Sequence, residues 1–107
     1  MPIIEVKPMS VNRAWQGRRF KTPEYRKYER KLIALMPEME IPEGKLSICY
    51  EFGFSSASSD IDNPVKLLQD ILQKRYGFDD KRIYKMTVTK TKVSKGNEYL
   101  KYELKRF

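Results

Sequence analysis

Residues 45–54 read KLSICYEFGF, a run in which apolar and polar side chains alternate. In an extended chain the apolar members share one face, and they are Leu46, Ile48, Tyr50, Phe52 and Phe54. The alternation predicts a β-strand with one buried face, and the rest of the fold is built outward from it. We interpret the three aromatic side chains as core residues; the alternative is that they stack on nucleic-acid bases.

Two segments precede this strand. Residues 3–6 (IIEV) predict a short strand, and residues 9–21 predict a basic, irregular loop. A helix is expected to begin at Thr22-Pro23, because threonine caps helices and proline suits the first helical position. Its apolar face recurs at helical spacing, and Pro37 ends it. The members of that face are Tyr25, Tyr28, Leu32, Leu35 and Met36.

A second helix follows the strand. Asn63 is its expected cap, Pro64 its first residue, and Gly77 its left-handed end. Residues 82–93 and 98–107 then predict two strands of a hairpin around the turn 94–97, SKGN. The order β-α-β-α-β-β over residues 1–107 predicts a single α+β domain with a largely antiparallel or mixed sheet and two main helices.

Composition limits the function. The 107 residues carry a formal charge of +8, which favours a polyanionic partner such as nucleic acid. The chain has no histidine and one cysteine, Cys49. Catalysis by histidine-activated nucleophiles, histidine-ligated zinc and an internal disulfide are therefore excluded. No signal peptide and no apolar run of about 20 residues is present, so we expect a cytoplasmic protein outside the membrane.

Acidic side chains gather in an otherwise basic chain, in residues 58–70 (SSDIDNPVKLLQD) and 78–80 (FDD). Neighbouring carboxylates repel one another, and a divalent cation turns that cost into a gain. In extended chain Asp60 and Asp62 would project to the same side, and a helix running back across the sheet would bring Asp80 to them. These oxygen donors predict a site for Mg²⁺, with Mn²⁺ as a second choice.

Simpler interpretations of the same residues stay open. Asp62 or Asn63 would serve as a helix cap, and Asp60 would complement the helix dipole. Asp79 is interpreted as a turn residue. Lys66 and Asp70 stand one helical turn apart and would form an ordinary surface ion pair.

Basic residues crowd the first third of the chain and are expected to contact DNA phosphates in a sequence-tolerant way. The predicted DNA-binding residues are Asn12, Arg13, Arg18, Arg19, Lys21, Arg26, Lys27, Arg30 and Lys31. Further lysines near the C-terminus form a second candidate patch, consisting of Lys85, Lys90, Lys92 and Lys95. A non-catalytic basic nucleic-acid-binding module is the alternative function.

Three motifs together resemble the RusA family of phage-type Holliday junction resolvases. The first is Asp-x-Asp-Asn-x-x-Lys-x-x-x-Asp over residues 60–70, and the second is Gly-Phe-Asp-Asp over residues 77–80. The third is Pro-x-Ser-x-Asn over residues 8–12. The resemblance runs through nearly the whole chain.

The resemblance implies a homodimeric, magnesium-dependent endonuclease of phage or prophage origin, acting in the bacterial cytoplasm. Such an enzyme binds a four-way DNA junction and nicks two opposing strands symmetrically, in recombination and repair. Carried over by position, Asp60, Asp62 and Asp80 would hold the metal and Lys66 would be the essential basic residue. Asn63, Asp70 and Asp79 would support the site.

Overall fold

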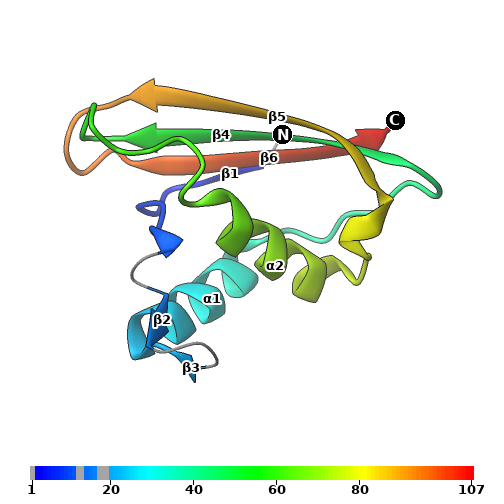
Figure 1. Cartoon of the computed structure of the whole chain (residues 1–107), viewed down its shortest axis with the longest axis horizontal. Coiled ribbons are helices and arrows are strands. Elements are labelled where there is room, and N and C mark those ends of the chain that lie inside the picture. The colour runs from blue at the N-terminus through cyan, green and yellow to red at the C-terminus, as the bar shows by residue number, and fades with distance from the viewer. Residues whose placement is uncertain (1, 12–13, 17–19) are drawn as a thin grey trace.

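The computed structural model describes residues 2–11, 14–16 and 20–107, with the backbone alone described for residues 15, 16 and 20. Two helices and a four-stranded sheet dominate the fold (Figure 1). The elements are β1 (Ile3–Ile4), β2 (Trp15–Gln16), β3 (Phe20–Lys21), α1 (Pro23–Leu35), β4 (Leu46–Phe54), α2 (Val65–Tyr76), a 3₁₀ turn (Asp80–Arg82), β5 (Ile83–Lys92) and β6 (Tyr99–Arg106). No helix in this described part of the chain is both long and apolar enough to span a membrane.

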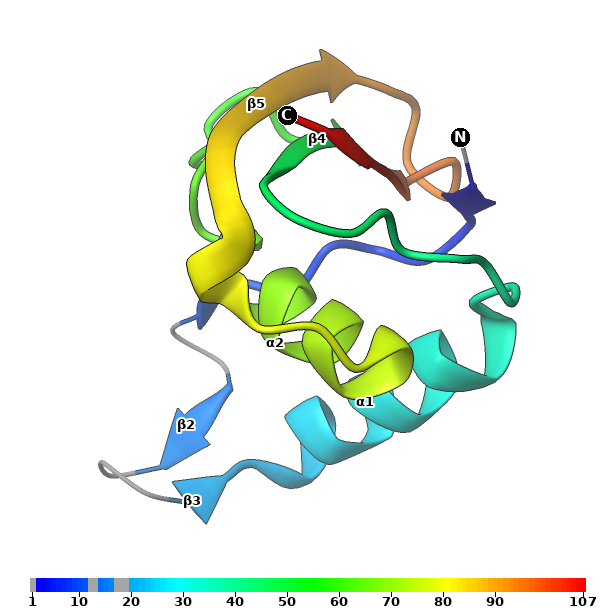
Figure 2. The same cartoon turned by 90° about the vertical axis from the view of Figure 1, so that its right-hand side faces the viewer.

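The sheet has the order β1-β6-β4-β5, so the alternating strand β4 lies inside it. β4 pairs antiparallel with β6 and parallel with β5, which confirms an α+β fold with a mixed sheet. Both helices cover the same face of the sheet (Figures 1 and 2). The apolar side chains of β4 form part of the buried core, as their alternation predicts.

The predicted hairpin is wrong in its pairing. The turn at residues 94–97 exists, with a 2.9 Å hydrogen bond from the Asn97 N–H to the Ser94 carbonyl. The strands that it joins are separated by β4, and the connection crosses the end of that strand, where the Val93 N–H bonds the Phe54 carbonyl at 2.8 Å. Two strand spacings are only about 10 Å, which a short connection spans easily. The most apolar strand occupies the centre because there it buries most surface.

The start of α1 is as predicted. The Thr22 hydroxyl oxygen accepts the Tyr25 backbone N–H at 3.1 Å, and Pro23 opens the helix. The predicted cap of α2 is wrong, because α2 begins at Val65 without a side-chain cap and Asn63 bonds elsewhere. Residues 61–64 form a turn instead of the extended chain expected around Asp60 and Asp62. Gly77 ends α2 in the left-handed conformation, at φ 72°.

The core lies between the helices and the sheet, and both helices contribute to it; the apolar positions predicted for α1 are buried with one exception. Leu35 is 52% exposed, because α1 ends there and Met36 is buried in its place. One charged residue of α1, Glu29, is also buried. The loop expected over residues 9–21 also differs, because β2 and β3 pair within it as a short ribbon.

Candidate functional site

The first acidic stretch, residues 58–70, begins in the connection from β4 to α2 and continues into that helix. Asp60 and Asp62 are exposed, and Asn63 is half-buried. The Asn63 side-chain amide donates to Asp60 Oδ2 at 3.3 Å, and the Asn63 carbonyl accepts the Val11 N–H at 3.2 Å. Asn63 therefore connects the Asp60 carboxylate, the start of α2 and the N-terminal segment that follows β1.

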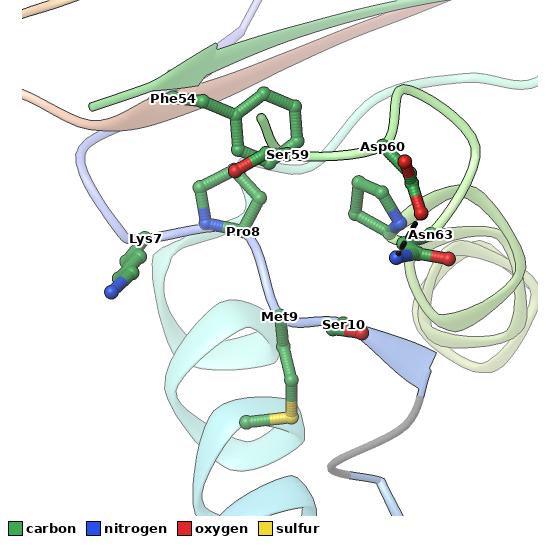
Figure 3. A pocket seen from close by; sticks show the side chains of 9 residues that line it. Lys7, Pro8, Met9, Ser10, Phe54, Ser59, Asp60 and Asn63 are labelled. Carbon is green, nitrogen blue, oxygen red and sulfur yellow. Dashed lines mark hydrogen bonds between the residues drawn. The ribbon is translucent and has the colours of Figure 1, made fainter. Parts of the chain in front are cut away.

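A cleft of about 340 Å³ opens beside Asp60. Figure 3 shows Lys7 and Asp60 on opposite sides of it, with Pro8 and Ser59 between them. Its walls come from the N-terminal segment, the end of β4 and the acidic loop. The lining residues are Lys7, Pro8, Met9, Ser10, Phe54, Ser59, Asp60, Asn63 and Pro64. The cleft thus combines apolar walls with a cation at one side and a carboxylate at the other.

Lys66 and Asp70 form the predicted ion pair on α2, with Nζ 2.8 Å from Oδ1. This hydrogen bond raises the pKa of Lys66 above its ordinary value, and the charges of Asp70 and Asp80 add to the effect. Lys66 is therefore positively charged at neutral pH. Its side chain is 63% exposed, so the ammonium is held by Asp70 yet accessible to a ligand.

Asp80 is tied to the last turn of α2. Its backbone N–H donates to Gln73 Oε1 at 3.0 Å, and the Gln73 amide donates to the Gln69 carbonyl at 3.5 Å. The Gln69 side chain in turn accepts the hydroxyl of buried Tyr50 at 3.3 Å. A chain of hydrogen bonds thus connects the core to the backbone of Asp80.

Asp79 has the turn role predicted for it. Its Oδ1 accepts the Lys81 N–H at 2.9 Å and so caps the 3₁₀ turn. This backbone hydrogen bond lowers the pKa of Asp79. The role is local: it shapes the turn that carries Asp80.

The predicted metal-binding carboxylates come from two segments of the chain. Asp60 and Asp62 precede α2, whereas Asp80 follows it, with its backbone N–H bonded to Gln73 and its charge acting on Lys66. Among the residues that the structure describes, no group of three or more acidic or cysteine side chains is close enough to hold a metal ion. The oxygen donors suit Mg²⁺, which takes one or two carboxylates together with water and phosphate oxygens. The ligand roles of the three carboxylates stay predictions.

The predicted DNA-binding residues that the structure describes fall into two groups. Arg26, Lys27, Arg30 and Lys31 are exposed and form what we call the α1 basic face. Lys21 is instead bound to buried Glu29 at 2.8 Å. Asn12, Arg13, Arg18 and Arg19 are outside the described residues.

Three structural contacts were not evident from the sequence. Glu29 bridges Lys21 and Lys74, at 2.8 and 2.7 Å, and so joins α1 to α2. Gln73 holds Asp80, and Lys90 bonds the loop before Asp60. Gln69 and Gln73 stand four residues apart, a spacing that places both on one side of a helix. This was a weak indication that Gln73 makes a side-chain contact. Lys74 is 45 residues from Glu29 and Ala57 is 33 residues from Lys90, and no local pattern marks either contact.

Comparison with known proteins agrees with the motifs. The family model described as endodeoxyribonuclease RusA matches residues 2–101. The match includes β1, both helices, the acidic segment and the 3₁₀ turn. Among curated proteins, none matches the chain.

Proposed function

The chain belongs to the RusA family of endodeoxyribonucleases, and from this premise we propose that it resolves four-way DNA junctions. The proposed reaction is metal-dependent phosphodiester hydrolysis that places paired, symmetric nicks. We place it in recombination and repair in the bacterial cytoplasm, with a homodimer as the active form, since two equivalent subunits match two opposing strands. The family match over residues 2–101 is the observation that carries this proposal.

The residues around α2 support this chemistry. Asp60, Asp62 and Asp80 are the proposed holders of Mg²⁺ or Mn²⁺, which would supply an activated water and neutralise charge on the phosphate. Lys66 is a charged and accessible donor, so it is the proposed partner of the scissile phosphate. Asn63 orients Asp60, and Asp70 holds Lys66.

Binding of the junction is assigned to other surfaces. The α1 basic face presents four exposed cations to the DNA backbone. The cleft beside Asp60 offers a place for the strand near the cut, with Lys7 for a phosphate and apolar walls for a sugar or base. Junction binding and cleavage are thus assigned to different residues. A substitution should therefore be able to weaken one of them and leave the other unchanged.

The alternative, a binding module without catalysis, is less well supported. In its base-stacking form it would need the aromatic side chains of β4 to be available to bases. Tyr50 and Phe52 are fully buried and Phe54 is 8% exposed, so these rings are occupied within the core. We therefore keep the endonuclease as the proposed function.

A cleavage assay tests the proposal. Labelled four-way, three-way and linear DNA are incubated with the protein, with Mg²⁺, with Mn²⁺ and with a chelator, while light scattering gives the oligomeric state. We expect symmetric nicks in the four-way junction, dependent on metal, and little cutting of linear duplex. Tight junction binding without cleavage in any metal would replace the proposal with the binding module.

A further inference from the structure

Lys90 of β5 makes a contact that differs from those of the other lysines. In the sheet register it stands beside Phe52, on the side of the sheet that faces the helices. Its ammonium donates to the Ala57 carbonyl at 2.7 Å and also to the Ser59 carbonyl. Two of its three N–H groups are therefore committed to the backbone of the acidic loop.

The loop that Lys90 holds has little else to fix it. The other hydrogen bonds described for residues 56–59 are local: the Ser59 N–H bonds the Ser56 carbonyl at 3.3 Å, the Ser58 N–H bonds the Ser56 hydroxyl at 3.3 Å, and the Ser56 and Ser58 hydroxyls lie 2.8 Å apart. Such short-range bonds shape a loop but do not attach it to the sheet. Lys90 supplies that attachment from a strand more than 30 residues later, and it does so at Ser59, the residue before Asp60.

We propose that Lys90 is a positioning residue for Asp60: it fixes the loop so that the Asp60 carboxylate stands at the cleft beside Asn63. This inference rests on the proposed function for the role of Asp60. It also revises the interpretation of Lys90 as a DNA contact, because an ammonium that bonds two carbonyls has one donor left for a phosphate. Ser59 and Asp60 line the cleft, so the same contact defines one of its walls.

The test compares three variants of the full chain. Lys90→Met removes the donors and keeps most of the aliphatic stem, whereas Lys90→Arg keeps a cation with several donors. Lys105→Met is the matched control, because it removes one positive charge from a side chain that is 70% exposed on β6. Amide hydrogen exchange of residues 57–60, the Mg²⁺ dependence of nicking, kcat and KM, and junction affinity in a chelator are measured for each.

A positioning role predicts a specific pattern. In Lys90→Met the amides of residues 57–60 should exchange about tenfold faster, and kcat should fall about tenfold with a higher Mg²⁺ requirement. Junction affinity in the chelator should equal that of Lys105→Met, and Lys90→Arg should recover part of both losses. If Lys90→Met is too unstable to study, Lys90→Gln gives the same comparison.

Two results would overturn the inference. One is unchanged exchange and unchanged Mg²⁺ dependence in Lys90→Met. The other is a loss of junction affinity in the chelator, beyond that of Lys105→Met, with normal exchange, which would make Lys90 a DNA contact. If the wild-type protein cuts no DNA, the proposed function fails and the role for Asp60 fails with it, while the exchange measurement still decides whether Lys90 holds the loop.

Discussion

Gln73 Oε1 accepts the backbone N–H of Asp80 at 3.0 Å, and this bond joins the last turn of α2 to the turn before β5. The helix end itself is set by Gly77, whose left-handed conformation lets the chain turn back. Gln73 then holds the returning segment against the helix. The position of Asp80 is therefore set by a side chain seven residues earlier.

Substitution of Gln73 should disturb Asp80 without unfolding the protein. Gln73→Met keeps the length of the side chain but lacks the acceptor, so the Asp80 amide should exchange about 2- to 12-fold faster, the range expected for one net hydrogen bond. Gln73→Glu keeps an acceptor and should restore slow exchange. Amide exchange measured by NMR checks this directly, and equal exchange in Gln73→Met and wild type would refute it.

Loss of one proposed ligand should separate cleavage from binding. Asp62→Asn keeps the shape of the side chain but weakens its hold on a cation, so nicking of a four-way junction should fall at least about 100-fold. Junction affinity should be unchanged or tighter, because a negative charge near the DNA has been removed. Glu40→Gln, which removes an exposed charge outside the site, is the control. Normal nicking by Asp62→Asn would be incompatible with its assigned role.

The α1 basic face should determine how binding depends on salt. Replacing Lys27 and Arg30 by glutamine should weaken junction binding and reduce the slope of log affinity against log salt by about 2, because each of the two cations neutralises one phosphate. Replacing Lys105 and Arg106 removes the same charge from the exposed C-terminal end of β6 and should alter the slope little. Titrations at several salt concentrations measure both. Equal salt slopes for the two double variants would show that the salt dependence of binding follows the net charge of the protein and not the α1 basic face.

Glu29 should make stability depend on pH. Burial would raise the pKa of Glu29, but the hydrogen bonds from Lys21 and Lys74 outweigh it and hold the pKa below its ordinary value of 4.5. Near that pH the unfolded chain binds more protons than the folded one, so stability decreases as the pH falls through this range. Above it the stabilisation is fully present.

Glu29→Gln should therefore lower the free energy of unfolding by about 1–2 kcal/mol at pH 7, since both lysines remain partly hydrated. The difference from wild type should shrink as the pH falls below 4.5, because Glu29 becomes protonated first in the unfolded chain and only at lower pH in the folded one. Denaturant unfolding at pH 7 and at lower pH measures it, with exposed Glu43→Gln as the control. A difference that does not change with pH would point to altered packing instead of the removed charge.

The local parts of the fold follow from the sequence because their causes are local. The alternation in residues 45–54 specifies a half-buried strand, Thr22-Pro23 specifies a helix start, and Gly77 specifies a helix end. The Asp60 to Asp80 motif likewise points to the family that the comparison shows. The strand and helix signals depend on side chains within a few residues of one another, and the family motif depends on residue types at fixed spacings along the chain.

Tertiary structure decided the pairing and the contacts between distant residues. The turn at residues 94–97 is the same whether its strands are neighbours or lie on either side of β4, so only burial in the assembled sheet selects the order β6-β4-β5. The bonds from Lys90 to Ala57 and from Lys74 to Glu29 join residues 33 and 45 positions apart. Such pairs leave no periodic trace in a sequence, because their energy is gained only after the chain has packed.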